Sequence, residues 1–356
     1  MNTIQANSYN VYFNQECYLF LNAFLLEKKY SKLFILVDSN GNEVVLPQFL
    51  AEIATETSIE IIELEPGEEH KNIATCLSVW EALTELGADR KSLIINVGGG
   101  VITDLGGFVA ATFKRGIDFI NVPTSLLAMV DASIGGKNGV DLGNLKNQIG
   151  TITVPQAVLI DTQYLATLPQ NHMRSGLSEM LKHGLIYDKS YWQKFLDLSQ
   201  LTTDDLDILI HESVHIKNQI VMQDPTENGI RKSLNFGHTL GHAIESYFLD
   251  HPDKTTLLHG EAIAIGMILE SHIAMQKNYL SPIAYSEIKK AITAMFEPVI
   301  ITPSDITSIT ELLIHDKKNE YGKVQFALIE DIGKPLTNQQ VDNKLITNAF
   351  LDYNSD

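Results

Sequence analysis

Two kinds of hydrophobic pattern alternate in the first half of the chain. Residues 72–86 have helical periodicity that places four apolar side chains on one stripe: Leu77, Trp80, Leu83 and Leu86. Short apolar, β-branched runs that end in turn residues or polar clusters lie around it at 32–40, 58–67, 92–100, 118–125 and 157–165. Near-continuous apolar strands separated by helices predict a parallel sheet that is covered on both faces.

The second half is almost entirely helical in pattern. Its periodicity predicts helices at about 172–187, 203–223, 231–248, 260–278, 282–296 and 304–315. A further apolar run at 323–331 is typical of a late strand or hairpin arm. We therefore predict an α/β domain with a parallel, Rossmann-like nucleotide-binding sheet over 1–168, followed by a mostly α-helical domain over 169–356.

The composition indicates an ordinary globular chain with an acidic balance. The 356 residues are 44% hydrophobic and 20% charged, and 44 acidic against 26 basic residues give a net charge of −18. This balance argues against nucleic-acid binding, so any bound anion must occupy a locally basic pocket. The two cysteines, Cys17 and Cys76, form no motif, which argues against a disulfide framework and a thiolate metal cluster.

The apolar window 93–113 is long enough to imitate a membrane span, but its five glycines favour a buried strand, a loop and a helix. The first residues show neither a basic segment nor an apolar one, so we expect no signal peptide. We expect a soluble, cytoplasmic protein.

A glycine-rich turn, "INVGGGVITDLGG", follows one predicted strand and opens a helix. Gly98–Gly100 would let the backbone approach a phosphate at the helix N-terminus, although the turn is not GxGxxG and could be purely structural. Asp38 ends another strand, and "PGEEHK" and "PTSLLAMVD" follow two more. Ligands of such sheets bind at the carboxyl ends of strands, so the sequence indicates a nucleotide site here.

Two histidines lie four residues apart in "LNFGHTLGHAIESY". Two imidazoles and a carboxylate with one open position form a known catalytic zinc pattern, and the candidate ligands are Glu179, His238, His242 and His259. Spacing alone favours His238 and His242 together; one ligand with one proton carrier, or two core histidines, remain alternatives. Gly237 and Gly241 would weaken a helix here, which suggests that something approaches the backbone.

Several basic residues lie in polar segments of this acidic chain: Lys137, Lys146, Lys217, Arg231, Lys317 and Lys318. Each alone is typical of a solvated surface charge. Together, near the glycine-rich turn, they suggest a pocket for an anionic substrate.

Five segments resemble the 3-dehydroquinate synthase family of sugar phosphate cyclases: "GGGVITDLGGF", "PTSLLAMVDASIGGKNGVD", "GLSEMLKHG", "LNFGHTLGHA" and "HGEAIAIGM". The resemblance runs from about Asp38 to Lys318. It implies an NAD-binding α/β domain, a helical domain that binds metal and substrate, a Zn²⁺ or Co²⁺ ion in the cleft between them, and a homodimer.

The resemblance also implies site residues. The metal ligands would be Glu179, His238 and His259, which leaves His242 for the substrate and replaces the spacing-based pair. The NAD contacts would be Asp38, Asn40, Glu68, Lys71, Gly99, Gly100, Val101, Asp104, Thr124, Ser125, Leu127, Lys137, Lys146 and Thr167. The substrate contacts would be Asp131, Lys137, Asn147, Lys182, Lys217, Glu227, Arg231, Asn235, His242 and one or both of Lys317 and Lys318. Arg115 would reach the neighbouring subunit's site.

The implied activity is that of a carbon–oxygen lyase. It converts 3-deoxy-D-arabino-heptulosonate 7-phosphate to 3-dehydroquinate and phosphate by transient oxidation with NAD, phosphate elimination, re-reduction, ring opening and aldol closure. From charge, we expect the phosphate to be held by Lys137, Asn147, Lys182 and His242. Lys217 and Arg231 would hold the carboxylate and ring hydroxyls, and Asn235 would orient a hydroxyl.

Three positions depart from the family pattern: Thr103 replaces a usual glycine, Ser125 a common threonine, and Pro66 an acidic residue. None removes an implied zinc ligand. Other interpretations are another sugar phosphate cyclase, a metal-dependent polyol dehydrogenase, and a nucleotide-binding module without activity.

Overall fold

The computed structural model describes residues 1–143, 145–197, 203–313, 319–320 and 323–355. The chain divides into two compact units, unit 1 (Met1–Met173) and unit 2 (Arg174–Asp356). The predicted assignment of NAD binding to 1–168 and of metal and substrate binding to 169–356 stays a prediction.

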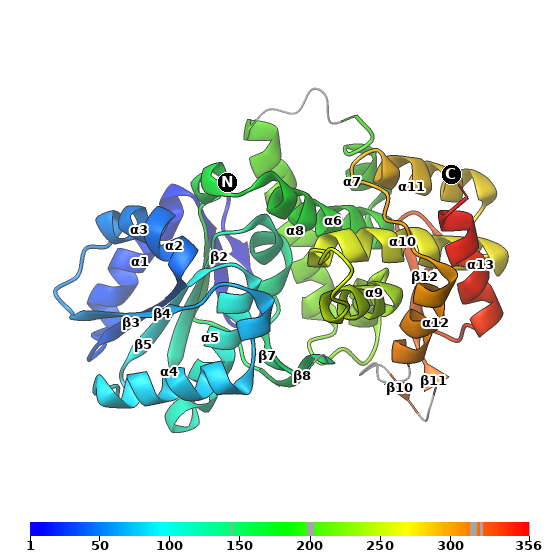
Figure 1. Ribbon diagram of the computed structural model, residues 1–356. Helices are drawn as coiled ribbons and strands as arrows, with labels where there is room; N and C mark the ends of the chain where they lie inside the picture. The colour runs from blue at the N-terminus through cyan, green and yellow to red at the C-terminus, as the bar shows by residue number, and fades with distance from the viewer. Residues whose placement is uncertain (144, 198–202, 314–318, 321–322, 356) are drawn as a thin grey trace. The chain divides into compact units, whose positions relative to one another are not determined.

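Unit 1 is built around a seven-stranded sheet (Figure 1). Its strands are β1 (Ile4–Gln5), β2 (Asn10–Phe13), β3 (Leu33–Asp38), β4 (Ile59–Leu64), β5 (Leu93–Gly98), β6 (Asp118–Pro123) and β9 (Ala157–Ile160). They lie in the order β1-β2-β9-β6-β5-β3-β4, and all neighbours are parallel except β1 and β2. The five predicted strands and their parallel arrangement are confirmed.

Helices connect these strands on both sides of the sheet (Figure 1). They are α1 (Gln15–Lys28), α2 (Ser39–Val44), α3 (Leu46–Glu52), α4 (Ile73–Glu85) and α5 (Gly100–Thr112), with short turns η1 (Glu68–His70), η2 (Phe113–Arg115), η3 (Ala128–Ala132) and η4 (Thr162–Thr167). Every residue of β5 is buried, which explains its continuous apolar run. The predicted α/β class is thus confirmed for this unit.

The buried face of α4 differs from the predicted stripe. Leu77 is 52% exposed, and the helix buries Cys76, Val79 and Leu83 instead. Trp80 and Leu86 pack partly against the same core. The prediction was wrong at Leu77 because a helix turns about 100° per residue, and the face that is centred on Val79 turns Leu77 towards solvent.

A hairpin that the sequence did not predict adds to unit 1. It pairs β7 (Lys137–Leu142) with β8 (Leu145–Ile152) in antiparallel register and lies next to α5. Glycine makes the close approach of α5 possible, because a Cβ at Gly107 would lie 2.0 Å from Asn138 Oδ1. The hairpin thereby brings Lys146 and Asn147 into unit 1.

Unit 2 is mostly helical, as predicted. Its helices are α6 (Gln170–Tyr187, whose first turn lies in unit 1), α7 (Lys189–Gln193), α8 (Thr203–Gln223), α9 (His238–Asp250), α10 (His259–Gln276), α11 (Pro282–Thr293), α12 (Pro303–Leu312) and α13 (Asn343–Tyr353), with a turn η6 (Ile230–Asn235). Residues 262–274 of α10 are all buried and form the centre of this unit's core. The short α7 and the terminal α13 were not predicted.

One predicted helix, 231–248, is broken. Gly237 has φ of 77°, in the left-handed region, and separates η6 from α9. The prediction of a continuous helix with Gly237 inside it was therefore wrong: the glycine begins the helix, and His238 is its first residue.

Four short strands complete unit 2: β10 (Asn319–Glu320), β11 (Lys323–Val324), β12 (Phe326–Asp331) and β13 (Lys334–Gln339). The predicted late strand is present as β11 and β12, and β12 pairs with β13. Among the residues that the structure describes, no helix is long and apolar enough to cross a membrane.

Candidate functional site

The predicted nucleotide contacts of unit 1 follow the carboxyl ends of neighbouring parallel strands. Asp38 ends β3, and Gly98 ends β5, where Gly99 precedes the first residue of α5. From β3 the chain proceeds outward to β4, whereas β5, β6 and β9 follow on its other side. The direction of winding thus changes between β3 and β5. Open α/β sheets bind ligands at such a switch point, so the topology supports a nucleotide site here.

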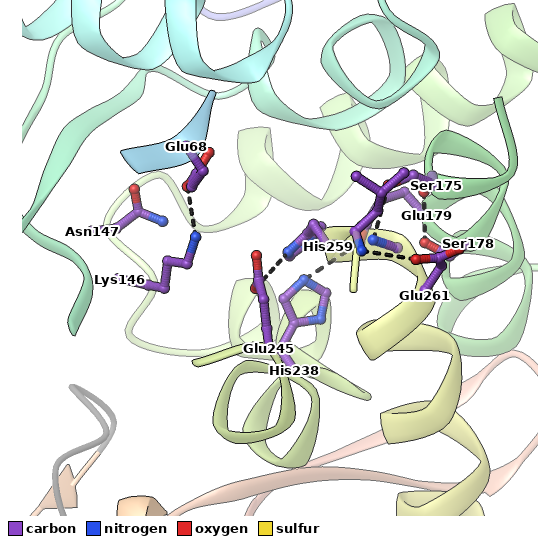
Figure 2. A network of polar contacts seen from close by, with 12 residues as sticks. Glu68, Lys146, Asn147, Ser175, Ser178, Glu179, His238, Glu245, His259 and Glu261 are labelled. Carbon is purple, nitrogen blue, oxygen red and sulfur yellow. Dashed lines mark hydrogen bonds and ion pairs between the residues drawn. The ribbon is translucent and has the colours of Figure 1, made fainter. Parts of the chain in front are cut away.

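A buried ionic cluster lies beside this edge. Lys71 Nζ is 2.7 Å from Asp104 Oδ2 and 3.9 Å from Glu68 Oε1. Lys146 Nζ lies 2.9 Å from Glu68 Oε1, a pair that Figure 2 shows. Burial lowers the pKa of Lys71, but the carboxylates of Asp104, Glu68 and Asp141 outweigh it and hold the pKa above its usual value. The four sequence-predicted members of this cluster are therefore brought together.

Asp141 is a member of the cluster that the sequence analysis missed. It is buried on β7, and its carboxylate accepts a hydrogen bond from Asn147 N at 2.6 Å and lies 3.7 Å from Lys146 Nζ. Asn147 has a positive φ of 49°, and its Oδ1 accepts from Lys71 Nζ at 2.8 Å. Asp141 thus fixes a strained turn that presents two predicted site residues.

The other implied NAD contacts of unit 1 lie outside the ionic cluster, and several of them make local hydrogen bonds. Asp38 Oδ1 accepts from Gly41 N at 2.7 Å and caps α2. Thr124 N donates to Gly98 O at 3.0 Å, which joins the turn after β6 to the glycine-rich turn. Ser125 Oγ accepts from Ala128 N, and Thr167 Oγ1 donates to Tyr164 O. Val101 lies in the first turn of α5, Asn40 in α2 and Leu127 just before η3.

Apart from Asn147, the residues of unit 1 that are implied to act on substrate lie on three elements. Asp131 lies in η3, and Lys137 begins β7 with an exposed side chain. Arg115 is exposed at the end of η2 and has a positive φ of 70°.

In unit 2, close packing through glycines brings three helices together. A Cβ at Gly260 would lie 2.1 Å from Ser175 O of α6, and one at Gly266 would lie 1.9 Å from Gly237 O. α10 therefore lies directly against the N-terminal parts of α6 and α9. Something does approach the backbone of Gly237 and Gly241, as predicted, and it is α10.

This packing gathers the predicted metal ligands. Glu179 is fully buried on α6, and its Oε1 lies 3.5 Å from Nε2 of His238 and 3.5 Å from Nε2 of His259. Figure 2 shows Glu179, His238 and His259 around one point. The ring of His242 is 5.1 Å from that of His238, and nitrogens of the three histidines lie within 4.8 Å of one another. All four candidates therefore share one place.

The hydrogen bonds of the imidazoles fix which nitrogen faces Glu179. His238 Nδ1 lies 3.1 Å from the carbonyl oxygen of Phe236, and His259 Nδ1 lies 3.2 Å from Glu245 Oε2. Both partners can only accept, so each Nδ1 carries a proton, and Nε2 is the nitrogen that can offer a lone pair to an ion at the common point. A carboxylate and imidazole lone pairs are the donor set that Zn²⁺ and Co²⁺ take, so these residues fit a divalent ion.

The electrostatics of this group favour a cation. Burial disfavours the imidazolium form of His259, but the carboxylates of Glu245 and Glu179 outweigh it and raise the pKa of His259 to about 10. The second oxygen of Glu179 contacts the ammonium of Lys182, one helical turn later on α6. One oxygen of Glu179 is thus held by Lys182, and the other faces the histidines.

Two carboxylates that the sequence analysis missed support the histidines. Glu245 contacts His259, and the fully buried Glu270 of α10 accepts from the backbone N–H groups of Gly237, Thr239 and Leu240 at 2.7, 3.1 and 3.1 Å. Glu270 therefore caps the first turn of α9, which carries His238. Glu245 lies two turns after His238 on the same helix face, a spacing that could have revealed it.

The other predicted substrate contacts of unit 2 lie on α8 and in the segment after it. Lys217 is buried on α8, and Arg231 is buried in η6, where its Nη1 donates to Pro225 O at 2.7 Å. Asn235 Nδ2 donates to Glu227 Oε1 at 2.9 Å, and Glu227 has a positive φ of 61°. Lys317 and Lys318 lie outside the described residues.

The comparisons first define a class. The structure of a 2-deoxy-scyllo-inosose synthase complexed with carbaglucose-6-phosphate, NAD⁺ and Co²⁺ superposes with a TM-score of 0.87 at 26% identity, covering 99% of each chain. A 2-epi-5-epi-valiolone synthase from Streptomyces hygroscopicus with NAD⁺ and Zn²⁺ bound gives 0.83 at 24% identity, over 99% of this chain and 98% of that one, and shows the fold alone. The fold is therefore that of the sugar phosphate cyclases.

Sequence comparison then identifies the family. The profile described as 3-dehydroquinate synthase N-terminal matches residues 61–175, and the one described as 3-dehydroquinate synthase C-terminal matches 176–319. The 3-dehydroquinate synthase of Parabacteroides distasonis is 39% identical over 94% of each chain, and that of Pelobacter propionicus is 40% identical over 83% of this chain and 82% of its own. The chain belongs to the 3-dehydroquinate synthase family, as its sequence motifs indicated.

Proposed function

We propose that the protein converts 3-deoxy-D-arabino-heptulosonate 7-phosphate to 3-dehydroquinate and phosphate as an NAD- and metal-dependent carbon–oxygen lyase. Membership of the family at 39% identity over 94% of the chain supports this activity. The observation that carries the proposal is the group of Glu179, His238 and His259, in which Glu179 Oε1 lies 3.5 Å from Nε2 of each histidine.

A divalent metal would be held by Glu179, His238 and His259, with His242 left for the substrate. When bound there, the ion supplies a Lewis acid that lowers the pKa of a substrate hydroxyl. The related inosose synthase is complexed with Co²⁺ and the related valiolone synthase with Zn²⁺, and both ions suit this donor set. Lys182 holds the second oxygen of Glu179, which leaves Oε1 to face the histidines.

NAD would bind to unit 1 at the carboxyl ends of β3, β5 and β6. Asp38 would accept a ribose hydroxyl, and the backbone N–H groups of Gly99, Gly100 and Val101 would face the pyrophosphate at the start of α5. The buried pairs of Lys71 and Lys146 hold the walls of this site in place before the cofactor arrives.

The basic and amide side chains would position an anionic substrate. Lys137, Asn147, Lys182 and His242 would hold the leaving phosphate. Lys217 and the planar fork of Arg231 would hold the carboxylate and ring hydroxyls, and Asn235 would orient a hydroxyl with Glu227 as its partner. We also propose a homodimer in which Arg115 reaches the neighbouring subunit's site; its exposure and left-handed backbone suit such a contact.

Phosphate release from the heptulosonate phosphate tests this proposal. We expect release that stops when NAD is removed or a chelator is added and resumes when Zn²⁺ or Co²⁺ is restored. Net accumulation of NADH would instead indicate a polyol dehydrogenase, a class whose fold is related: a probable glycerol dehydrogenase from Sinorhizobium meliloti superposes with a TM-score of 0.64 at 15% identity. Release from another sugar phosphate alone would indicate a different cyclase.

A further inference from the structure

We propose that Glu245 is a positioning residue for the metal ligand His259: its carboxylate fixes the tautomer and the orientation in which the imidazole presents Nε2 to the ion. The inference rests on the proposed function, because it assumes that the group of Glu179, His238 and His259 binds a metal. It adds a residue that lies outside the implied ligand and substrate-contact sets.

The geometry places Glu245 behind His259. Glu245 Oε2 lies 3.2 Å from His259 Nδ1, and the opposite ring nitrogen, Nε2, lies 3.5 Å from Glu179 Oε1. Figure 2 shows the three side chains in this sequence, with a dashed line between Glu245 and His259. The side chain of Glu245 is 9% exposed, so water competes little for its carboxylate.

The carboxylate determines the protonation of the ring. A carboxylate cannot donate, so its bond with Nδ1 requires the proton on Nδ1 and leaves the lone pair on Nε2. Its negative charge also makes the imidazole a stronger base and a stronger ligand. Both effects act on the nitrogen that faces Glu179.

The two metal-ligand imidazoles differ in how they are held. His238 is 9% exposed and donates to a neutral acceptor, Phe236 O. His259 is 25% exposed, so packing restrains its ring less. The bond to the Glu245 carboxylate therefore has more to contribute at His259 than the neutral bond to Phe236 O has at His238, and loss of Glu245 should free the ring of His259 to rotate or change tautomer.

Metal affinity of the full-length protein tests the inference directly. Metal-free wild type, Glu245→Gln and Glu245→Ala would be titrated with Zn²⁺ by calorimetry and with Co²⁺ by visible absorption. We expect Glu245→Ala to weaken zinc binding by about 10–100-fold. Glu245→Gln keeps an oxygen acceptor for Nδ1 but loses the charge, so its Kd should lie between those of wild type and Glu245→Ala. NAD affinity should not change.

The control is Glu287→Gln. Glu287 is a half-buried carboxylate of the same unit that accepts from Trp192 Nε1 at 2.8 Å. It loses the same charge without a bond to an imidazole, so its zinc Kd should match wild type. A similar loss in Glu287→Gln would show a general effect of weakened packing and would overturn the proposal.

Two further outcomes decide the inference. If both Glu245 variants bind zinc within twofold of the wild-type affinity, the role of Glu245 is overturned. A Co²⁺ absorption spectrum that is the same in the variants and in wild type would support that conclusion. If circular dichroism shows that Glu245→Ala does not fold, Glu245→Gln decides alone. Wild type that binds no divalent ion would contradict the proposed function itself, whereas metal-binding wild type with unaffected variants contradicts only the role of Glu245.

Discussion

Units 1 and 2 both collect charge at their predicted sites, but they balance it in different ways. In unit 1, the carboxylates of Glu68, Asp104 and Asp141 face two permanent cations, Lys71 and Lys146, at 2.7–3.9 Å. The charges of this group largely neutralise one another, so it can be rigid before any ligand binds.

In unit 2, the carboxylates of Glu179 and Glu245 face imidazoles, which are cations only when protonated. The raised pKa of His259 shows that this group attracts a positive charge. A divalent ion supplies that charge without a proton. The difference indicates that unit 1 is organised by its own side chains, whereas the histidine group of unit 2 is completed by what it binds. Substitutions in each unit should therefore affect different observables.

The largest effect is expected for Glu179→Gln. The amide keeps the shape of the side chain but removes the only charged ligand of the implied metal set. Phosphate release should fall by about 10³-fold or more, since a Lewis acid contributes several kcal/mol to such a step. Zinc affinity measured by calorimetry should fall with it, while NAD affinity stays at the wild-type value. Retained zinc affinity would assign the metal to His238, His242 and His259 instead.

Lys71→Met should act on the other unit. It leaves the carboxylates of Asp104 and Glu68 without their buried cation, which should lower the free energy of unfolding by about 3–5 kcal/mol. Urea unfolding measures the loss, and zinc affinity should not change. The matched control is Lys194→Met, because Lys194 pairs with Glu212 on the surface with 43% and 37% of the side chains exposed. That variant should lose only about 0–1 kcal/mol. Equal losses would contradict a special role for the buried cluster.

Arg231→Lys tests the anion site of unit 2. Lysine keeps the charge but not the planar fork, so the KM for substrate should rise by about tenfold or more, the equivalent of 1.4 kcal/mol. NAD affinity should stay unchanged; equal loss of both would refute the assignment of Arg231 to substrate. Lys232→Arg is the control, because the neighbouring Lys232 is half-buried and donates to Asn338 Oδ1 rather than into the predicted site.

Asp141→Asn tests separately what the buried carboxylate does for the stability of unit 1 and for its predicted NAD site. Burial raises the pKa of Asp141 above 3.8 despite the attraction of Lys71 and Lys146, so the charged form costs folding free energy. That cost is absent below about pH 3.8, develops as the pH rises and is complete above the folded-state pKa.

The stability of Asp141→Asn relative to wild type should therefore improve as the pH rises through that range, measured by urea unfolding at each pH. At neutral pH the two proteins should differ by less than about 1 kcal/mol. The KM for NAD should rise a few-fold, because Lys146 loses a charged neighbour. A stability difference that falls with increasing pH would contradict the raised pKa.

The sequence predicted most of the sheet because a buried parallel strand must be apolar at nearly every position. β3 and β5 satisfy that requirement, and the polar residues that follow them mark the strand ends. The parallel arrangement also followed, because helices separate the strands, whereas the order of the strands did not. The hairpin of β7 and β8 was missed because its polar, glycine-rich segments resemble a loop, and Asp141 was missed with it.

The candidate site was predictable where its residues lie within one sequence motif. His238 and His242 could be paired by spacing. Glu179 and His259, which come from two other helices, were candidates as well, and the family resemblance selected them with His238. Contacts between helices were harder to see: Glu270 caps α9 from about 30 residues away, and Glu245 reaches His259 from the preceding helix, α9. The left-handed Gly237 could not be distinguished from a glycine inside a helix by pattern alone.

The smallest effect is expected for Thr103→Ala, at the position where the resemblance implied a glycine. The hydroxyl of Thr103 is buried and donates to Gly99 O and Gly100 O at 3.3 and 3.2 Å, inside the first turns of α5. It therefore bonds to its own helix and leaves the N–H groups of that turn for a phosphate. Its loss should change the free energy of unfolding by less than about 1 kcal/mol and leave NAD affinity within about twofold of the wild-type value.

The control is Thr112→Ala, which removes an equivalent hydroxyl, bonded to Phe108 O at 2.7 Å, at the far end of α5. If NAD affinity fell tenfold in Thr103→Ala but not in Thr112→Ala, Thr103 would contact the cofactor. The glycine-rich turn of unit 1 would then be completed by the NAD that it binds, like the histidine group of unit 2, and would not be organised by the side chains of unit 1 alone.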